Sequence, residues 1–157
     1  MALVLRALMP EDGAAARAFV TGQLAESRYR IRGLELLDTA LLFEDPEHLA
    51  LLAFSESEAR LLGIVLFGTV AGARAVVKVH GVLAHERGPA IALLDAVRQA
   101  SEHSGARMIV CELPDDAPFA VAADALEACG FVEEGRVPDF VRDGVALRLL
   151  VRPLCGA

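Results

Sequence analysis

Three observations predict the fold class of this chain, an α/β domain with a mixed sheet and helices packed on it. Its 157 residues, 55% of them hydrophobic, suit a single domain (1–157) with a substantial core. Three strand-like runs follow one another between residues 49 and 84 with no helix between them, which is typical of an antiparallel meander. The turn of small residues that leads from strand to helix comes after the fourth strand rather than the first, which argues against a doubly wound fold.

The N-terminal part of the chain is predicted to form one strand and two helices. Residues 2–8 are an apolar run of strand length. Pro10-Glu11-Asp12 then begins a helix, because proline suits a first turn and acidic residues there favour the helix dipole. Its apolar face continues to about residue 27. A second helix is predicted at 34–43, before Asp45-Pro46.

A meander of three strands is predicted next. The strands occupy residues 49–55, 60–69 and 74–84. The polar residues 56–58 join the first two, and the glycine-bearing turn 71–72 joins the second to the third. Connections this short favour antiparallel pairing of neighbours.

Helices and strands alternate in the C-terminal half. A helix at 89–103 places Ile91, Leu94 and Val97 on one face, and the strand at 107–113 is parallel to its predecessor if that helix is a crossover. The remaining elements are a helix at 118–129, ended by Gly130, and strands at 131–136 and 145–153 around the turn Asp143-Gly144. The predicted order is β-α-α-β-β-β-α-β-α-β-β.

Charge and residue spacing argue against several classes of function. A net charge of −7 disfavours nucleic acid as the main partner. Three widely spaced cysteines form no disulfide framework, which favours a reducing, cytoplasmic setting, and the four histidines show no metal-ligand spacing, so no metal is expected. The uncharged run 61–73 is too short to span a membrane and residues 1–6 do not form a signal peptide, so no membrane association is expected.

The turn between the fourth strand and its following helix is the most informative segment. It consists of Arg87-Gly88-Pro89-Ala90-Ile91-Ala92. A helix N-terminus offers unpaired N–H groups and partial positive charge, and small side chains let an anion approach the backbone. The segment therefore suits a diphosphate, although a plain strand–helix turn accounts for the same residues.

Three segments in this order resemble the GNAT superfamily of acyl-CoA-dependent N-acetyltransferases, across essentially the whole chain. The first is Val82 with Arg87–Ala92, which is similar to the family's pyrophosphate motif. The second is Ala122 to Gly130-Phe131, which is similar to the second cofactor motif. The third runs from Glu134-Gly135-Arg136 to Phe140-Val141-Arg142-Asp143-Gly144 and is similar to the closing segment.

The resemblance implies a GNAT-like mixed, mostly antiparallel sheet of about seven strands with helices on both faces. It implies acetyl-CoA as the acyl donor, bound in a gap between the fourth and fifth strands, and direct transfer in a ternary complex to a primary amine of a small molecule or peptide. The cofactor-binding residues it implies are Val82, Ala84, Arg87, Gly88, Ala90, Ile91 and Ala92. The apolar strand 145–151 also suits a homodimer interface.

The chain departs from the family's pattern at several positions. Ala90 and Ala92 stand at glycine positions and Pro89 removes an N–H donor, so the phosphate site requires these residues to be helical. The usual tyrosine, the general acid for the departing thiolate, is replaced by Leu126, and a frequent asparagine by Phe119. A thiol titrates near pH 8.5, so its thiolate can leave unprotonated, and general acid catalysis contributes only about 10²–10⁴-fold.

Two residues are candidates for the general base that an ammonium acceptor requires. His80 has the better intrinsic pKa, and Glu112 near the end of the fifth strand is the second. Each could equally be an ordinary strand residue, and a water relay is a further option. The segment Tyr29–Gly33, which contains the only tyrosine, falls where the family forms a wall of the acceptor pocket.

Two further interpretations stay open. The changes at Leu126, Ala90 and Ala92 also fit a degenerate GNAT-fold module that binds a CoA ester or a protein partner without turnover. Alternatively, the apolar residues Leu126 and Phe119 favour a longer acyl donor. The acceptor itself cannot be predicted from the residues.

Overall fold

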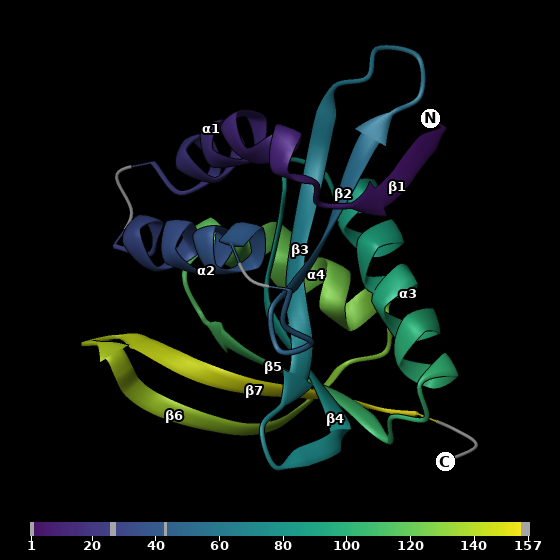
Figure 1. Ribbon diagram of the computed structural model, residues 1–157. Helices are drawn as coiled ribbons and strands as arrows, with labels where there is room; N and C mark the ends of the chain where they lie inside the picture. The colour runs from purple at the N-terminus through teal and green to yellow at the C-terminus, as the bar shows by residue number, and fades with distance from the viewer. Residues whose placement is uncertain (1, 26–27, 43, 155–157) are drawn as a thin grey trace.

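The computed structural model describes residues 2–25, 28–42 and 44–154, and its seven strands form one mixed sheet (Figure 1). The strand order is β1-β2-β3-β4-β5-β7-β6, and among the described residues only the β4–β5 pair is parallel. The strands are β1 (Leu3–Ala7), β2 (Leu49–Ser55), β3 (Leu61–Val70), β4 (Ala73–Ala84), β5 (Met108–Pro114), β6 (Val132–Arg142) and β7 (Val145–Pro153).

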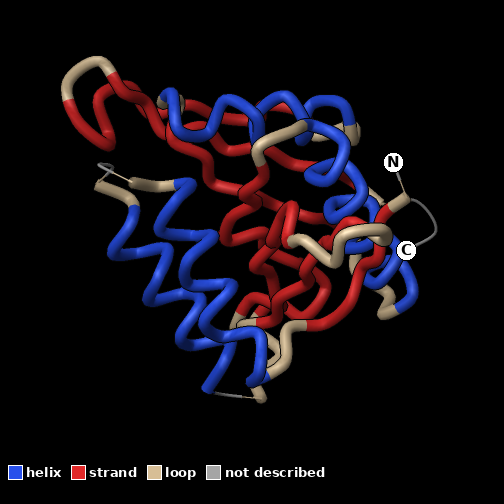
Figure 2. Tube along the Cα trace, turned by 90° about the horizontal axis from the view of Figure 1, so that it is seen from above, coloured by secondary structure: helices blue, strands red, loops and turns tan. Residues whose placement is uncertain are grey.

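Four helices cover the two faces of this sheet. Helices α1 (Gly13–Gln23) and α2 (Arg30–Leu42) lie on one face, and α3 (Arg87–His103) and α4 (Ala120–Ala128) lie on the other. Figure 2 shows the strands between the two helical layers. The predicted order of elements, the mixed sheet and the helices on both faces are confirmed, and α3 is the crossover that makes β4 and β5 parallel.

The boundaries differ from the sequence prediction most clearly in the first two helices and in β6, and the 118–129 helix is also divided, into a 3-10 turn (Ala117–Phe119) and α4. The first helix is divided into a 3-10 turn (Pro10–Asp12) and α1, which ends at Gln23. The second helix begins four residues earlier than predicted, at Arg30. Strand β6 continues to Arg142 because it pairs with β7 up to Val137–Leu147 and, after an irregular stretch, again at Arg142–Val145 beside the two-residue turn.

Each face of the sheet has its own hydrophobic cluster. The α3/α4 cluster is formed by side chains of β3, β4 and β5 together with both helices, and includes the fully buried Val79, Leu93, Ile109 and Leu126. The α1/α2 cluster is smaller and contains Val20, Leu37, Leu52, Ile64 and Leu83. Neighbouring residues of one strand enter opposite clusters, as the two-residue period of a strand requires.

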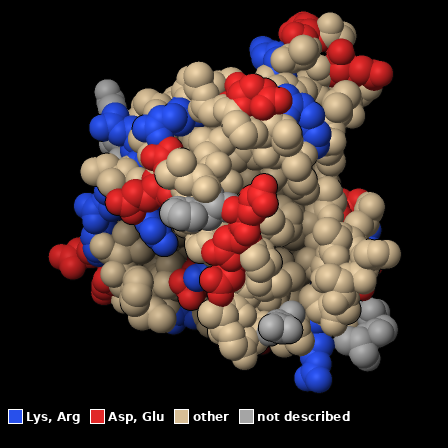
Figure 3. Space-filling model, viewed as in Figure 1, with Lys and Arg blue, Asp and Glu red and all other residues tan. Residues whose placement is uncertain are grey.

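Among the described residues, none of the helices has both the length and the apolar character required to cross a bilayer. On the face seen in Figure 3, Lys and Arg side chains are interspersed with Asp and Glu and form no continuous basic patch.

Candidate functional site

Strands β4 and β5 separate in the middle of the sheet. Their parallel pairing runs from Val76–Met108 to Val79–Cys111, and the described residues show no β4–β5 pair beyond it. Both strands nevertheless continue, β4 to Ala84 against β3 and β5 to Pro114 against β7. The facing edges of β4 and β5 therefore have no strand partner over the last residues of each, and backbone groups there are available to another extended chain.

A β-bulge in β4 lies at the point of separation. Val79 pairs with Phe67 and Gly81 pairs with Leu66, so His80 is an extra residue on β4. A bulge bends its strand and often ends its pairing. It also changes the side-chain alternation, because Val79 and Val82 both belong to the α3/α4 cluster although they are three residues apart.

A cavity of about 310 Å³ opens beside the separated strands. Its floor is formed by Lys78 and residues 80–83 of β4 and by residues 111–114 of β5. Arg32, Gly33 and Leu36 of α2 cover it on one side. The other lining residues are Leu24, Tyr29, Ile64, Leu66, Phe119, Phe140 and Leu147. The cavity thus brings together both candidate bases, His80 and Glu112, with Tyr29, Arg32 and Gly33 of the Tyr29–Gly33 segment.

His80 is held in one orientation by a backbone carbonyl. Its Nε2 lies 2.9 Å from the carbonyl oxygen of Glu47. Because a carbonyl can only accept, Nε2 carries the proton and Nδ1 of the neutral ring carries a lone pair. Burial is the main cause that lowers the pKa of His80 below 6.5, and nearby His48, Lys78 and Arg32 lower it further, whereas the hydrogen bond that the ring donates to the Glu47 carbonyl raises it. The neutral base is therefore the favoured form at neutral pH.

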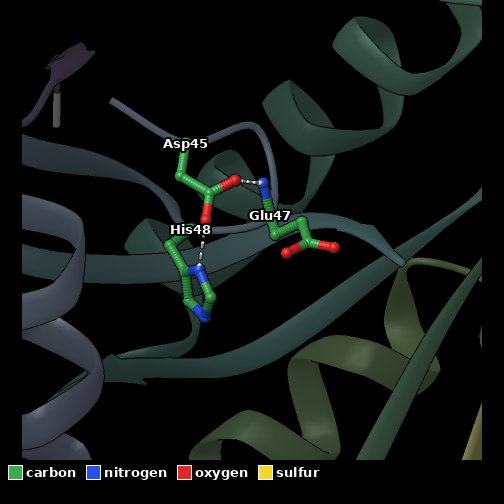
Figure 4. A group of neighbouring side chains, drawn as sticks. All are labelled: Asp45, Glu47 and His48. Carbon is green, nitrogen blue, oxygen red and sulfur yellow. Dashed lines mark hydrogen bonds and ion pairs between the residues drawn. The ribbon is translucent and has the colours of Figure 1, made fainter. Parts of the chain in front are cut away.

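The carbonyl that orients His80 belongs to a tight turn packed on β3. Asp45 accepts hydrogen bonds from the Glu47 N–H at 3.0 Å and from the His48 ring at 3.2 Å (Figure 4). The turn lies so close to Gly68 that a Cβ at this position would be 2.1 Å from the Glu47 oxygen. Only glycine permits this approach. The His48 ring in turn stacks on His80, with centroids 5.4 Å apart.

Asp45, Glu47 and His48 also form a group with metal-ligand atoms within 4.8 Å of one another. Both Asp45 oxygens and the His48 Nδ1 are already used by the hydrogen bonds of the turn itself. The turn accounts for this group, and we assign it to the positioning of His80.

Charged side chains of both signs line the cavity. Lys78 Nζ lies 3.6 Å from the Glu112 carboxylate, and the two side chains are 33% and 52% exposed. Arg32 lies 3.5 Å from Glu35, and both of these side chains are exposed. Neither ion pair is close or buried, so both cations can interact with a ligand.

Tyr29 lines the cavity and connects its α1–α2 side to residues distant in sequence. Its ring packs edge-on against Phe119 at 4.7 Å, and its hydroxyl donates to Asp116 at 2.8 Å. Arg142 of β6 holds the same carboxylate with two hydrogen bonds, of 2.7 and 3.1 Å. Burial and the hydrogen bond to Asp116 raise the pKa of Tyr29, so its proton is held rather than released.

The N-terminus of α3 lies at the far end of β4. Glu86 is the N-cap and no side chain caps the helix. Because Pro89 has no N–H, the unpaired donors of the first turn are those of Glu86, Arg87 and Gly88. Ala90 lies inside the helix, as the phosphate site requires.

The side chains at the turn between β4 and α3 contact two different helices, α4 and α1. Arg87 lies 3.3 Å from Asp124 of α4, and both are exposed. His85 accepts or donates a hydrogen bond of 2.8 Å with Gln23 of α1, and a second hollow of about 330 Å³ lies beside it. Of the other residues implied in cofactor binding, Val82 and Ala84 have buried side chains and lie in the part of β4 that pairs with β3 but not with β5. Ile91 and Ala92 are half-buried on α3.

The remaining candidates lie away from the cavity or are inert. Leu126 is fully buried in the α3/α4 cluster, so it does not line the cavity, whereas Phe119 does. Burial raises the pKa of the Cys111 thiol to about 12, which makes it a poor nucleophile. Burial also raises the pKa of Cys129. Cys155 lies outside the described residues.

Sequence reasoning missed Lys78, Phe140 and the Glu47 carbonyl as parts of this site. A backbone carbonyl leaves no residue signature. The change of alternation between Val79 and Val82 was a readable signal for the bulge, since two apolar residues on one face should differ by an even number of positions.

Comparison with known proteins gives a likeness in structure alone. No family model and no curated protein matches the sequence. A protein described as an acetyltransferase of the GNAT family from Desulfovibrio desulfuricans has a TM-score of 0.79 and 18% identity, over 97% of this chain and 99% of that one.

Two further solved structures agree with it. A Salmonella typhimurium protein described as an acetyltransferase, solved with its cofactor acetyl-CoA, has a TM-score of 0.75 and 15% identity, over 100% of this chain and 96% of that one. The ribosomal-protein-S18-alanine N-acetyltransferase of Escherichia coli has a TM-score of 0.75 and 13% identity, over 99% and 96%. At these identities the likeness shows the fold, which is that of the GNAT acetyltransferases.

Proposed function

We propose that this chain is an acetyl-CoA-dependent N-acetyltransferase that acts on primary amines by direct transfer in a ternary complex. The observation that carries the proposal is the separation of β4 from β5 beside a cavity that contains an oriented, neutral histidine. The GNAT fold supports it, since the fold is shared with the N-acetyltransferases named above.

Acetyl-CoA fits the part of β4 that has no β5 partner and the helix N-terminus that follows it. The edge of β4 around Val82 and Ala84 offers unpaired backbone groups to the extended pantetheine arm. The uncapped N-terminus of α3, with Gly88 open to solvent, offers N–H donors and partial positive charge to the diphosphate. Arg87 adds a cation whose exposed pair with Asp124 is weak enough to be exchanged.

Acetyl-CoA supplies the activated acetyl group: the amine nitrogen bonds to the carbonyl carbon, the carbon–sulfur bond breaks, and its electron pair leaves on sulfur. His80 takes the proton of the attacking ammonium on Nδ1, directly or through one water. The Glu47 carbonyl holds the ring in the tautomer that leaves Nδ1 free to accept it. Glu112 is the second candidate for this proton and lies beside Lys78.

No general acid is assigned to the leaving sulfur. Leu126 is buried away from the cavity, and Tyr29 is held by Asp116 with its pKa raised, which makes it a poor donor. A thiolate leaves without a proton at moderate cost, so orientation in the cavity and polarisation by backbone N–H groups supply the remaining acceleration. The inert Cys111 is consistent with transfer that bypasses an acyl-enzyme.

Calorimetric titration with acetyl-CoA, followed by thiol release with a panel of primary amines, tests the proposal. We expect binding and turnover on at least one amine. Tight binding with no turnover on any amine would favour a module that senses a CoA ester, an alternative consistent with the buried Leu126. Absence of binding would contradict both. Propionyl-CoA in parallel measures whether the apolar wall at Phe119 prefers a longer acyl group.

A further inference from the structure

The cavity is more basic than the chain that contains it. The protein carries a net charge of −7, yet the ionised side chains lining the cavity are Lys78, Arg32 and Glu112. His80 adds no charge in its neutral form. The described lining therefore has one more cation than anion, in a molecule where acidic side chains outnumber basic ones by 22 to 15.

Among the described residues, Lys78 and Arg32 are held only by long, exposed ion pairs and can therefore bind a ligand. The contact of Lys78 with Glu112 is 3.6 Å long, and that of Arg32 with Glu35 is 3.5 Å long and fully at the surface. Exposed ion pairs of this length contribute little to stability, so a ligand carboxylate can displace either glutamate or bind beside it. Lys78 lies two residues before His80 on β4, so the two side chains share one side of the strand, and Arg32 of α2 lines the same cavity. Both cations also lower the pKa of His80.

The rest of the wall is apolar and closed on one side. Leu36 of α2, Ile64 and Leu66 of β3, and Phe140 and Leu147 of the β6–β7 hairpin face the same space. The acid near this wall, Asp116, is already held by Arg142 and Tyr29, whose hydrogen bonds lower its pKa to about 2. This carboxylate stays ionised, but its charge is balanced by Arg142, so it does not offer a second site for an ammonium group.

We infer that the acceptor is a small amine that also carries a carboxylate and an apolar group, the pattern of an α-amino acid with an apolar side chain. Its carboxylate would lie between Lys78 and Arg32, its amine beside His80, and its side chain against the leucines and Phe140. A polycationic amine would meet two like charges and a single, paired carboxylate. The inference rests on the proposed acetyltransferase function and specifies its acceptor.

Acceptor competition with matched amines tests the inference. Thiol release from acetyl-CoA is measured with leucine, leucinamide and spermidine. The amine of leucinamide is less basic and more available as the free base, so intrinsic reactivity favours it. We expect kcat/KM for leucine to exceed that for leucinamide by about tenfold or more, as a charge-assisted hydrogen bond provides. Preference for leucinamide or spermidine would overturn the inference.

Two variants and one control identify the source of the preference. Arg32→Gln and Lys78→Met should each reduce the leucine-to-leucinamide ratio by about tenfold, through KM rather than kcat. Arg30→Gln removes a neighbouring cation of α2 that does not line the cavity and should leave the ratio unchanged. An unchanged ratio in both cavity variants would contradict the assignment.

A binding measurement separates failure of the inference from failure of the proposed function. Lys78 is the only lysine of the chain, so reductive ¹³C-methylation gives one lysine signal in the NMR spectrum and keeps its charge. If no amine is turned over but leucine, and not leucinamide, shifts this signal in the presence of CoA, the acceptor site stands and the transferase does not. If neither compound shifts it and neither is turned over, the inference is wrong as well.

Discussion

The two faces of the sheet use the same strands for different purposes. On the α3/α4 face, Val79, Leu93, Leu126 and their neighbours form a continuous apolar cluster in which side chains are almost completely buried. On the α1/α2 face the buried cluster is smaller, and it borders a cavity that contains histidine, lysine and glutamate. The α3/α4 face is closely packed with apolar side chains, whereas the α1/α2 face has less apolar packing and contains a polar cavity.

This difference explains why the position of Leu126 is uninformative about chemistry. A tyrosine there would lie in the packed cluster of this chain, away from the cavity. The polar groups that could act on a substrate come instead from residues of β4 and from the turn before β2. The following variants test the division between the two faces, beginning with the largest expected effect.

His80→Gln should lower kcat/KM by about 10²–10⁴-fold, the usual contribution of a general base, without changing acetyl-CoA affinity. Glutamine can still donate to the Glu47 carbonyl, so the packing of the turn is kept. His103→Gln, at the C-terminal end of α3, is the matched control. Thiol release at near wild-type rate in His80→Gln would show that the chemistry does not depend on this face.

The pH profile gives an independent measure of the same residue. His80 accepts a proton only when neutral, and burial lowers its pKa below 6.5, with His48, Lys78 and Arg32 as the other charged neighbours. Wild-type kcat should therefore be constant near neutrality and fall as the pH drops below this lowered pKa. This fall of kcat at low pH should disappear in His80→Gln. A fall of kcat with its midpoint above pH 6.5 would contradict a buried neutral base.

Gly68→Ala should destabilise the fold by about 1–3 kcal/mol, because its Cβ would overlap the Glu47 backbone. The turn must then move, and His80 loses the acceptor of its Nε2 proton. Urea unfolding measures the first effect, and ¹⁵N NMR of the ring tautomer measures the second. Gly22→Ala on α1, where the added methyl meets nothing within 4 Å, should instead be neutral or stabilising. An unchanged tautomer in Gly68→Ala would remove the positioning role.

Gly88→Asp should change stability and donor binding in opposite directions. A carboxylate in the first turn of α3 stabilises the helix by about 0.5 kcal/mol, and the position has open space. The same charge repels a diphosphate and should weaken acetyl-CoA binding about tenfold, as calorimetry would measure. Gly88→Asn has the same shape without the charge. Equal affinities for the two variants would favour a plain strand–helix turn.

Tyr29→Phe should have the smallest effect, a loss of about 0.5–1.5 kcal/mol of stability, since Asp116 keeps its two hydrogen bonds from Arg142. Because the pKa of Tyr29 is raised, kcat should change less than about threefold. Stopped-assay rates with a saturating amine are sufficient. A fall of two orders of magnitude would make Tyr29 the missing general acid.

How much was predictable from the sequence differs between the two faces. The bounds of β2 and β7, the presence of the crossover helix and the order of elements along the chain follow from periodicity and turn residues, and they agree with the structure. His80, Glu112 and the Tyr29–Gly33 segment were all assigned to the site region, and His80, Glu112 and three residues of the segment, Tyr29, Arg32 and Gly33, line the cavity. Local patterns predict these features because each depends on residues close together in the chain.

The rest depends on contacts between distant segments. Tyr29 meets Asp116 across 87 positions, and His80 meets the Glu47 carbonyl across 33. The gap between β4 and β5 was implied by the resemblance, but its position beside the bulge at His80, where the last pair is Val79–Cys111, was not. Backbone acceptors and close approaches such as that at Gly68 have no side-chain signature, so one sequence alone does not predict them.

The order of β6 and β7 in the sheet has a consequence for synthesis. Strand β6 lies at the edge and pairs only with β7, which follows it in the chain and joins β6 to β5. During translation β6 therefore leaves the ribosome before its partner exists. Phe140 lies on β6 and Leu147 on β7, so this wall of the cavity is completed only after β4 and α3 have been made. A nascent chain can therefore form the N-terminus of α3 while one side of the cavity is still open.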